Sequence, residues 1–189
     1  MAEPVTIVSG LPRSGTSMMM QMLVTGGLSA LTDDIRQPDE DNPRGYYEFE
    51  RVKQVAQDPS WLDGAEGKVV KMVYRLLYDL PGSHSYRVIF LRRNLDEVIA
   101  SQEEMLRRHG KQSDDVDPAQ LKEIYRRQLQ EVDAWLQDRP NFSVLYVDYQ
   151  DVLSDPERVV HELNRFLDGR LDVDAMLRVP DRSLYRQRR

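Results

Sequence analysis

An eight-residue glycine loop near the start of the chain has the spacing of an anion-binding motif. The run Gly10-Leu-Pro-Arg-Ser-Gly-Thr-Ser17 lies between a strand expected at 5–9 and a helix expected at 16–23. At such a junction, backbone N–H groups and the positive end of the helix dipole can hold an anion. The two glycines are spaced as in a nucleoside triphosphate P-loop, but Thr16 stands where that motif requires lysine. The cation of this loop is instead Arg13, inside it.

A second candidate motif begins at the end of a later strand. The stretch 86–91 is expected as a buried strand, and Asn94 as the cap of a helix that runs to about residue 109. Arg93 lies at the strand end, and Ser101 lies eight residues later, two turns inside the helix. An arginine and a hydroxyl in these positions can grip one phosphate from two sides.

Both motifs resemble those of sulfotransferases that use 3′-phosphoadenosine 5′-phosphosulfate (PAPS). The letters L-P-R-S-G-T-S resemble the 5′-phosphosulfate loop of that family, and the arginine form is most similar to the tyrosylprotein branch and to bacterial sulfotransferase-like proteins. Arginine at a strand end, with serine at this spacing, resembles the family's 3′-phosphate motif. A nucleotide with phosphates at both its 3′ and 5′ positions needs two such sites.

The resemblance implies a set of nucleotide-binding residues. Arg13 is expected to touch the bridging oxygen and the transferring sulfuryl group. The loop residues expected at the 5′ end are Pro12, Arg13, Ser14, Gly15, Thr16 and Ser17. Arg93 and Ser101 are expected at the 3′-phosphate, and the terminal Arg186 and Arg188 resemble the basic segment that closes over it. PAPS is the implied co-substrate, and 3′-phosphoadenosine 5′-phosphate (PAP) is the product.

One further cation is a candidate for the chemistry itself. The stretch 68–73, expected as a strand, resembles the segment where cytosolic sulfotransferases carry a lysine and, two residues later, a catalytic histidine. Lys71 matches the lysine, but Val73 occupies the place of the histidine. Sulfuryl transfer depends on positioning and on cationic stabilisation of developing charge. We therefore expect Arg13 and Lys71 to stabilise the sulfuryl group and the leaving oxygen.

Two acids compete for the role of general base, which contributes about 10²–10⁴-fold to rate. Glu48 follows the run Asn-Pro-Arg-Gly-Tyr-Tyr, which resembles a stretch of many bacterial sulfotransferase-like sequences. Asp34 is the alternative, because its separation from Arg13 resembles that of the catalytic glutamate in the tyrosylprotein branch. Glu48 is preferred. The histidines, at positions 84, 109 and 161, are expected to be structural or exposed.

The order of strand and helix signals is typical of a three-layer α/β/α domain with a mainly parallel, P-loop-like central sheet. Besides the elements above, the sequence predicts a helix at 48–57, a helix opened by Asp117-Pro118 and a strand at 142–147. Ser154 has capping-box spacing to Glu157, which predicts a helix to about residue 167. We expect residues 1–189 to form a single sulfotransferase-like domain.

Composition narrows the functional classes. The formal net charge of −6 argues against a general nucleic-acid binder. The chain has no cysteine, which excludes disulfides and thiolate sites, and its acids lack a familiar ligand spacing, so no metal is expected. The start lacks the features of a signal peptide, and no apolar run reaches the roughly 20 residues that span a bilayer. A cytoplasmic location is therefore expected.

The sequence thus predicts a PAPS-dependent sulfotransferase that acts on a hydroxyl or amine of a small-molecule or carrier-bound acceptor. One alternative is a P-loop kinase-like enzyme using ATP, which the missing lysine and the second arginine–serine motif disfavour. Another is a non-catalytic nucleotide-binding scaffold, which Val73 favours somewhat. The acidic stretch 33–50 indicates a cationic or neutral acceptor. Oligomeric state stays open.

Overall fold

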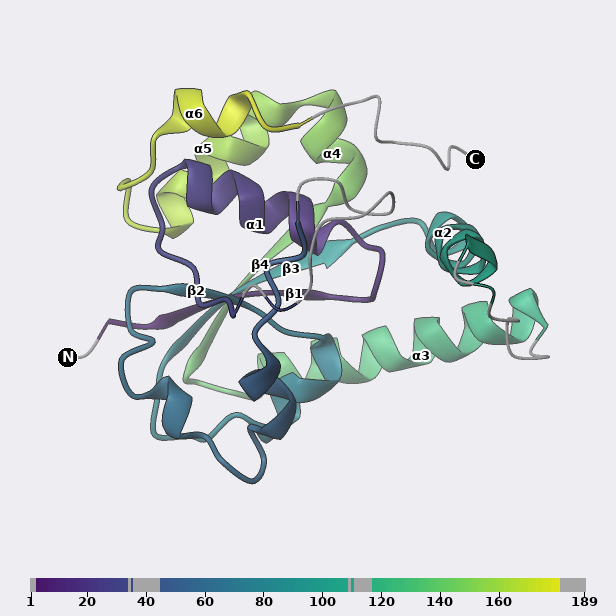
Figure 1. The fold of residues 1–189 in the computed structure, drawn as a ribbon, viewed down its shortest axis with the longest axis horizontal. Coiled ribbons are helices and arrows are strands. Elements are labelled where there is room, and N and C mark those ends of the chain that lie inside the picture. The colour runs from purple at the N-terminus through teal and green to yellow at the C-terminus, as the bar shows by residue number, and fades with distance from the viewer. Residues whose placement is uncertain (1–2, 34, 36–44, 109, 111–116, 181–189) are drawn as a thin grey trace.

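A sheet of four parallel strands forms the centre of the molecule, in the order β2-β1-β3-β4 (Figure 1). The computed structural model describes residues 3–33, 35, 45–108, 110 and 117–180. The strands are β1 (Val5–Gly10), β2 (Val69–Lys71), β3 (Tyr86–Arg92) and β4 (Phe142–Asp148). Helices cover both faces of this sheet, which confirms the predicted three-layer α/β/α class.

The two helical layers differ in the type of helix that they contain. One face of the sheet carries α1 (Thr16–Thr25), α4 (Tyr149–Ser154), α5 (Pro156–Phe166) and α6 (Val173–Leu177). The other face carries α3 (Pro118–Gln137) and three short 3₁₀ helices, η1 (Glu50–Gln54), η2 (Ser60–Leu62) and η3 (Tyr74–Asp79). The remaining helix, α2 (Leu95–Arg108), follows the carboxyl end of β3 and packs against α3.

Strand β1 is buried along its whole length because it separates two hydrophobic cores. Successive side chains of a strand point to opposite faces. Val5 and Ile7 accordingly pack in the core beneath α3 and the 3₁₀ helices, whereas Val8 packs in the core beneath α1 and α5. The methionines of α1 pack in this second core, where Met19, Met20 and Met22 are buried.

The strand order places a topological switch point between the carboxyl ends of β1 and β3. From β1 the chain crosses through α1 to β2 on one side, and from β3 it crosses through α2 and α3 to β4 on the other side. Such a change of direction opens a crevice where ligands bind in open α/β sheets. Both sequence motifs begin at this edge.

Two predicted elements are shorter than expected. The helix predicted at 48–57 is only the 3₁₀ helix η1, because Tyr47 adopts a left-handed φ of 51° and Phe49 is extended, which prevents an earlier start. The strand predicted at 68–73 is limited to Val69–Lys71. The chain leaves the sheet at Val73 to enter η3.

The capping-box prediction placed the start of the late helix one residue too early. Asp155, not Ser154, caps α5, and its carboxylate accepts a hydrogen bond from the Arg158 N–H at 3.3 Å. Ser154 instead ends α4, a short helix that the sequence analysis missed. Pro156 at the first position of α5 explains the break, because proline fits a first helical turn but interrupts a continuous helix.

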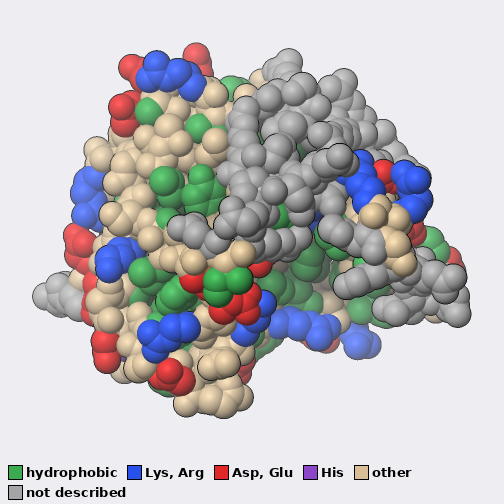
Figure 2. All heavy atoms as spheres, viewed as in Figure 1, with side chains coloured by type: hydrophobic (Ala, Val, Ile, Leu, Met, Phe, Trp, Pro, Cys, Tyr) green, Lys and Arg blue, Asp and Glu red, His purple; other side chains and the backbone are tan. Residues whose placement is uncertain are grey.

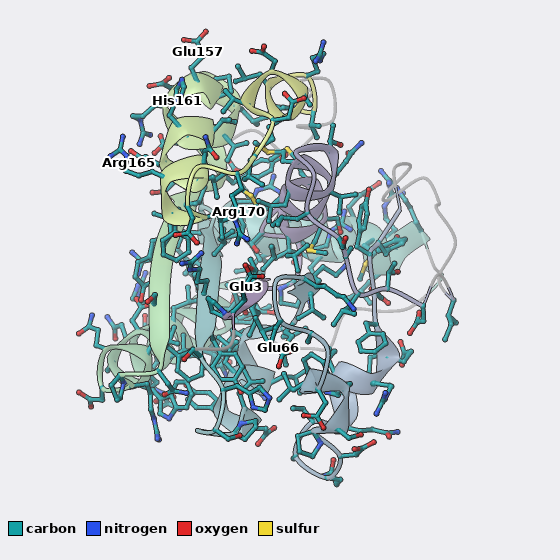
Figure 3. The ribbon with its side chains drawn as sticks, turned by 90° about the vertical axis from the view of Figure 1, so that its left-hand side faces the viewer. Glu3, Glu66, Glu157, His161, Arg165 and Arg170 are labelled. Atoms are coloured by element: carbon teal, nitrogen blue, oxygen red, sulfur yellow. The ribbon has the colours of Figure 1, made fainter. Side chains whose placement is uncertain are left out.

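At the opposite edge of the sheet, an ion pair joins the N-terminal segment to the loop after α5. Arg170, in the loop after α5, forms an ion pair with Glu3 at 2.7 Å (Figure 3).

His161 lies with Glu157 and Arg165 on the outward side of α5, as expected for an exposed histidine. Acidic, basic and hydrophobic side chains are interspersed over the coloured part of the face in Figure 2.

Candidate functional site

The register of the sheet brings the two sequence motifs to adjacent positions. Gly10, the last residue of β1, pairs with Leu91 of β3, and Arg92 pairs with Asp148 at the end of β4. The glycine loop, Gly10–Ser17, therefore leaves the sheet beside the segment that begins at Arg93. Residues that are 80 positions apart in the sequence thus lie at the same edge of the sheet.

The glycine loop has the conformation and polarity of an anion-binding turn. Arg13 and Gly15 both have positive φ angles, of 69° and 103°. A positive φ is uncommon for arginine, and such backbone strain concentrates at functional sites. Gly15 caps α1 without any side-chain hydrogen bond, and the first turn of α1 contains no acid. The N–H groups of this turn lack partners within the helix, so this end of α1 suits an anion.

Ser14 braces the loop from within. Its side chain is almost completely buried, at 1% exposure, and its hydroxyl donates a hydrogen bond to the Leu11 carbonyl at 2.7 Å. The Ser14 N–H also donates to this carbonyl, at 3.2 Å. The structure thus gives the Ser14 hydroxyl a partner inside the loop, whereas its expected contact with a 5′-phosphate stays a prediction.

Direct contacts join the two motifs. The Arg13 Nε donates to the Ser101 hydroxyl at 3.0 Å, and the Arg93 Nη1 donates to the Arg13 carbonyl at 3.0 Å. Ser101 is 7% exposed, on the side of α2 that faces the loop. Two arginines and a serine from separate motifs therefore form one cationic cluster.

Tyr149 supports both parts of this cluster. It follows the Arg92–Asp148 pair in the sheet, and the Arg93 guanidinium lies over its ring at 4.5 Å from the centroid. The same ring lies against the loop, because a Cβ added at Gly15 would be 2.4 Å from Tyr149 Cδ2. Burial raises the pKa of the Tyr149 phenol, so this group stays neutral at physiological pH. The sequence analysis missed Tyr149, although its position just after a predicted parallel strand was an available signal.

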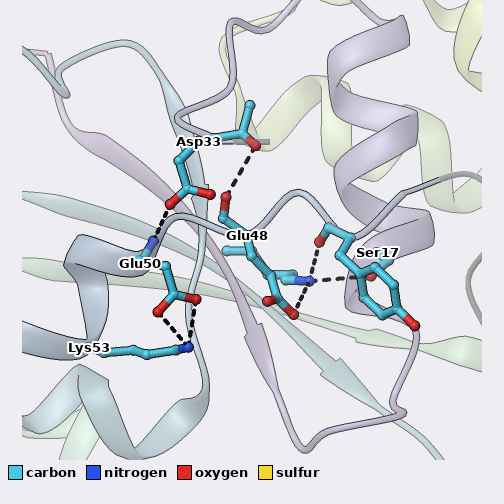
Figure 4. A network of polar contacts seen from close by, with 8 residues as sticks. Ser17, Asp33, Glu48, Glu50 and Lys53 are labelled. Atoms are coloured by element: carbon cyan, nitrogen blue, oxygen red, sulfur yellow. Dashed lines mark hydrogen bonds and ion pairs between the residues drawn. The ribbon is translucent and has the colours of Figure 1, made fainter. Parts of the chain in front are cut away.

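Lys71 and Glu48 lie together in a second polar network, of which Figure 4 labels Ser17 and Glu48. The Lys71 ammonium donates to the Tyr46 carbonyl and to the Ser17 hydroxyl, the latter at 3.4 Å, and it lies 3.9 Å from Glu48 Oε1. Ser17 belongs to the first turn of α1, so Lys71 connects the glycine loop to the segment that contains Glu48. Two predicted catalytic residues are thus neighbours.

The backbone around Glu48 is fixed from the other side by residues 32 and 33. The Glu48 carbonyl accepts hydrogen bonds from the Thr32 hydroxyl and from the Asp33 N–H, both at 3.1 Å. The Asp33 carboxylate in turn accepts from the Glu50 N–H at 2.6 Å. Glu48 keeps 27% of its side chain exposed, which leaves its carboxylate accessible to an acceptor.

Some sequence-predicted site residues lie outside the described residues. These are Asp34, the alternative base, and the terminal Arg186 and Arg188. Val73, which occupies the place of the histidine, is 44% exposed just beyond β2. Within the described ranges, no group of three or more acidic or histidine side chains is arranged to hold a metal ion.

A comparison of the sequence with known protein families identifies a sulfotransferase domain, the family that the two motifs resemble. A profile of the sulfotransferase domain matches residues 3–188. A comparison with curated protein sequences gives no significant match. The chain belongs to the sulfotransferase family, and sulfuryl transfer is the general chemistry that this membership supports.

Solved structures show the same fold at low sequence identity. The sulfotransferase domain from the curacin biosynthetic pathway has a TM-score of 0.58 and 16% identity, over 95% of this chain and 78% of that one. Sulfotransferase STF1 from Mycobacterium tuberculosis gives 0.57 and 17%, over 98% and 71%. Mouse sulfotransferase SULT7A1, complexed with PAP, gives 0.56 and 18%, over 96% of this chain but only 63% of its own length.

None of the helices formed by the described residues combines the length and the apolar character that a membrane-crossing segment needs.

Replacing Gly15 with alanine is expected to lower the free energy of unfolding by about 1–3 kcal/mol more than Gly27→Ala does. The two glycines have similar φ angles, of +103° and +106°, so both variants carry similar backbone strain. Only at Gly15 does the new Cβ collide with Tyr149, whereas nothing lies within 4 Å at Gly27. Urea denaturation of both variants measures the difference, and equal stabilities would mean that the Tyr149 ring does not constrain the loop.

Proposed function

We propose that this protein transfers a sulfuryl group from PAPS to a hydroxyl or amine of a small-molecule or carrier-bound acceptor. The observation that carries the proposal is the junction of the two motifs, where Arg13 contacts Ser101 and Arg93 contacts the Arg13 carbonyl. A nucleotide with phosphates at its 5′ and 3′ positions requires two neighbouring anion sites, and this edge of the sheet supplies candidates for both.

The proposed nucleotide site has two ends. Pro12 to Ser17 form the 5′ end, where the first turn of α1 has no side-chain cap and therefore supports binding of a phosphate. Arg93 and Ser101 form the 3′ end, where a guanidinium and a hydroxyl make charge-assisted hydrogen bonds to a phosphate. Arg186 and Arg188 are proposed to complete the 3′ end.

In the proposed reaction, the acceptor oxygen or nitrogen forms a bond to sulfur while the bond from sulfur to the 5′-phosphate oxygen breaks. The leaving oxygen keeps the electron pair and departs as PAP, and the acceptor proton moves to a carboxylate. Arg13 and Lys71 stabilise the charge that develops on the sulfuryl and leaving oxygens. Glu48 takes the proton, because its partly exposed carboxylate lies 3.9 Å from the ammonium of Lys71 and therefore near the sulfuryl group that Lys71 is proposed to stabilise. Asp34 is the alternative base.

Arg13→Ala is expected to lower kcat by about 10²–10³-fold, which is typical when one donor to a transition state is removed. PAP affinity should fall much less than kcat, by less than about tenfold, because PAP keeps only the leaving-oxygen contact of Arg13 and lacks the sulfuryl group whose transition-state charge Arg13 is proposed to stabilise. Release of PAP from PAPS, measured across phenol, alcohol and amine acceptors, gives the rate, and calorimetry gives the affinity.

Arg126→Ala is the matched control for Arg13, because this surface arginine of α3 pairs only with Glu123 among the described residues. Unchanged turnover in Arg13→Ala would refute the role of Arg13. Tight PAP binding by the wild type without transfer to any acceptor would instead favour the non-catalytic scaffold.

Glu48→Gln is expected to lower kcat/KM by about 10²–10⁴-fold, the usual contribution of a general base, while PAP affinity stays constant. Glu50→Gln is its control, because Glu50 lies two residues away and pairs with the exposed Lys53. The same turnover assay compares the two variants. Full activity of Glu48→Gln would exclude Glu48 as the base and make Asp34 the next residue to replace.

A further inference from the structure

Glu97 is a fully buried carboxylate that the proposed reaction does not use. Its side chain is 0% exposed, in the first turn of α2, and its Oε2 accepts from the Arg93 Nε at 3.0 Å. Its Oε1 lies 3.5 Å from the Gln150 Nε2 of α4. Burying a charge is costly unless the charge is paired and hydrogen-bonded, so the Glu97–Arg93 pair needs a physical account.

The Arg93 guanidinium is held on several sides. Its Nε donates to Glu97, its Nη1 donates to the Arg13 carbonyl, and its face lies on the Tyr149 ring. The side chain is only 8% exposed. Two hydrogen bonds and one ring contact fix the plane of the guanidinium, and Glu97 supplies the only carboxylate among these three contacts.

We propose that Glu97 is a positioning residue that orients Arg93 for the 3′-phosphate of the nucleotide. The inference rests on the proposed function, because it takes Arg93 as a 3′-phosphate ligand. An arginine recognises a phosphate through the geometry of its planar fork, so a guanidinium free to rotate binds less well than a fixed one. Glu97 fixes this fork from the Nε edge.

Charge alone predicts the opposite effect of the same substitution. A carboxylate near a phosphate site repels the ligand, so Glu97→Gln on charge grounds alone should tighten PAP binding. Positioning predicts weaker binding, because an amide holds the Arg93 Nε less firmly than a carboxylate does. The direction of the change in PAP affinity therefore shows whether Glu97 orients Arg93 or only repels the phosphate by its charge.

Asp96 provides a matched control for Glu97. It lies in the same first turn of α2, so it interacts similarly with the helix dipole. Its carboxylate pairs with Lys122 of α3 at 2.7 Å rather than with Arg93. Asp96→Asn removes one negative charge from nearly the same place and leaves the contacts of Arg93 intact.

The test is the ratio of affinities for PAP and for adenosine 5′-phosphate, measured by calorimetry on the full chain. This ratio isolates the contribution of the 3′-phosphate, and binding of the monophosphate shows that each variant is folded. Glu97→Gln is expected to reduce the ratio by about 10-fold, roughly the effect of exchanging a charge-assisted hydrogen bond for a neutral one. Asp96→Asn is expected to leave the ratio within about twofold.

Glu97→Asp is the second variant and decides the matter if Glu97→Gln does not fold. It keeps the buried charge but withdraws the carboxylate from the Arg93 Nε, so positioning again predicts a lower ratio and charge alone predicts no change. An unchanged or higher ratio in the Glu97 variants, or an equal loss in Asp96→Asn, would overturn the inference. A wild-type protein that does not prefer PAP would instead overturn the proposed function.

Discussion

The parallel register at the carboxyl ends of β1, β3 and β4 is the constraint on which the candidate site depends. Gly10 pairs with Leu91 and Arg92 pairs with Asp148, so three chain segments leave the sheet side by side. Because side chains alternate between the faces of a strand, a slip of one residue would exchange the faces of Arg92 and Arg93. Arg92 pairs with Asp133 of α3, whereas Arg93 contacts the glycine loop.

The cations of the site are held in place by the protein itself. Arg13 contacts the Ser101 hydroxyl, Lys71 contacts the Tyr46 carbonyl, and Arg93 contacts Glu97. Donors whose orientation is fixed before a ligand binds need little rearrangement during the reaction. The strained backbone at Arg13, with its φ of 69°, belongs to the same arrangement, since the surrounding contacts must hold it.

Much of the fold and part of the site could be predicted from the sequence because the signals are local. The apolar run of β1, the glycine spacing and the arginine–serine spacing each lie within one short stretch, and the family match agrees with them. The contact between Arg13 and Ser101 could not be derived in this way, because it depends on the order of the strands. The nucleotide-binding and catalytic roles of these residues stay predictions.

The missed features depend on tertiary structure. Tyr149 follows a predicted strand and Glu97 lies between Arg93 and Ser101, but their importance comes from packing against Gly15 and Arg93, which the sequence does not show. Asp155 replaced Ser154 as the cap because a short helix, α4, precedes it, and a capping-box pattern does not reveal what comes before. Tyr47, with its φ of 51°, and the extended Phe49 delayed the start of the helix predicted at 48–57.

The most direct test of the account is calorimetric titration of the wild-type protein with PAP in EDTA, with ADP and ATP as comparison ligands. The central claim is that the glycine loop and the Arg93–Ser101 pair form one site for a nucleotide with 5′- and 3′-phosphates. The account predicts tight, metal-independent binding of PAP and much weaker binding of ADP and ATP. Indifference to PAP, together with magnesium-dependent binding of ATP, would contradict it and favour a kinase-like enzyme.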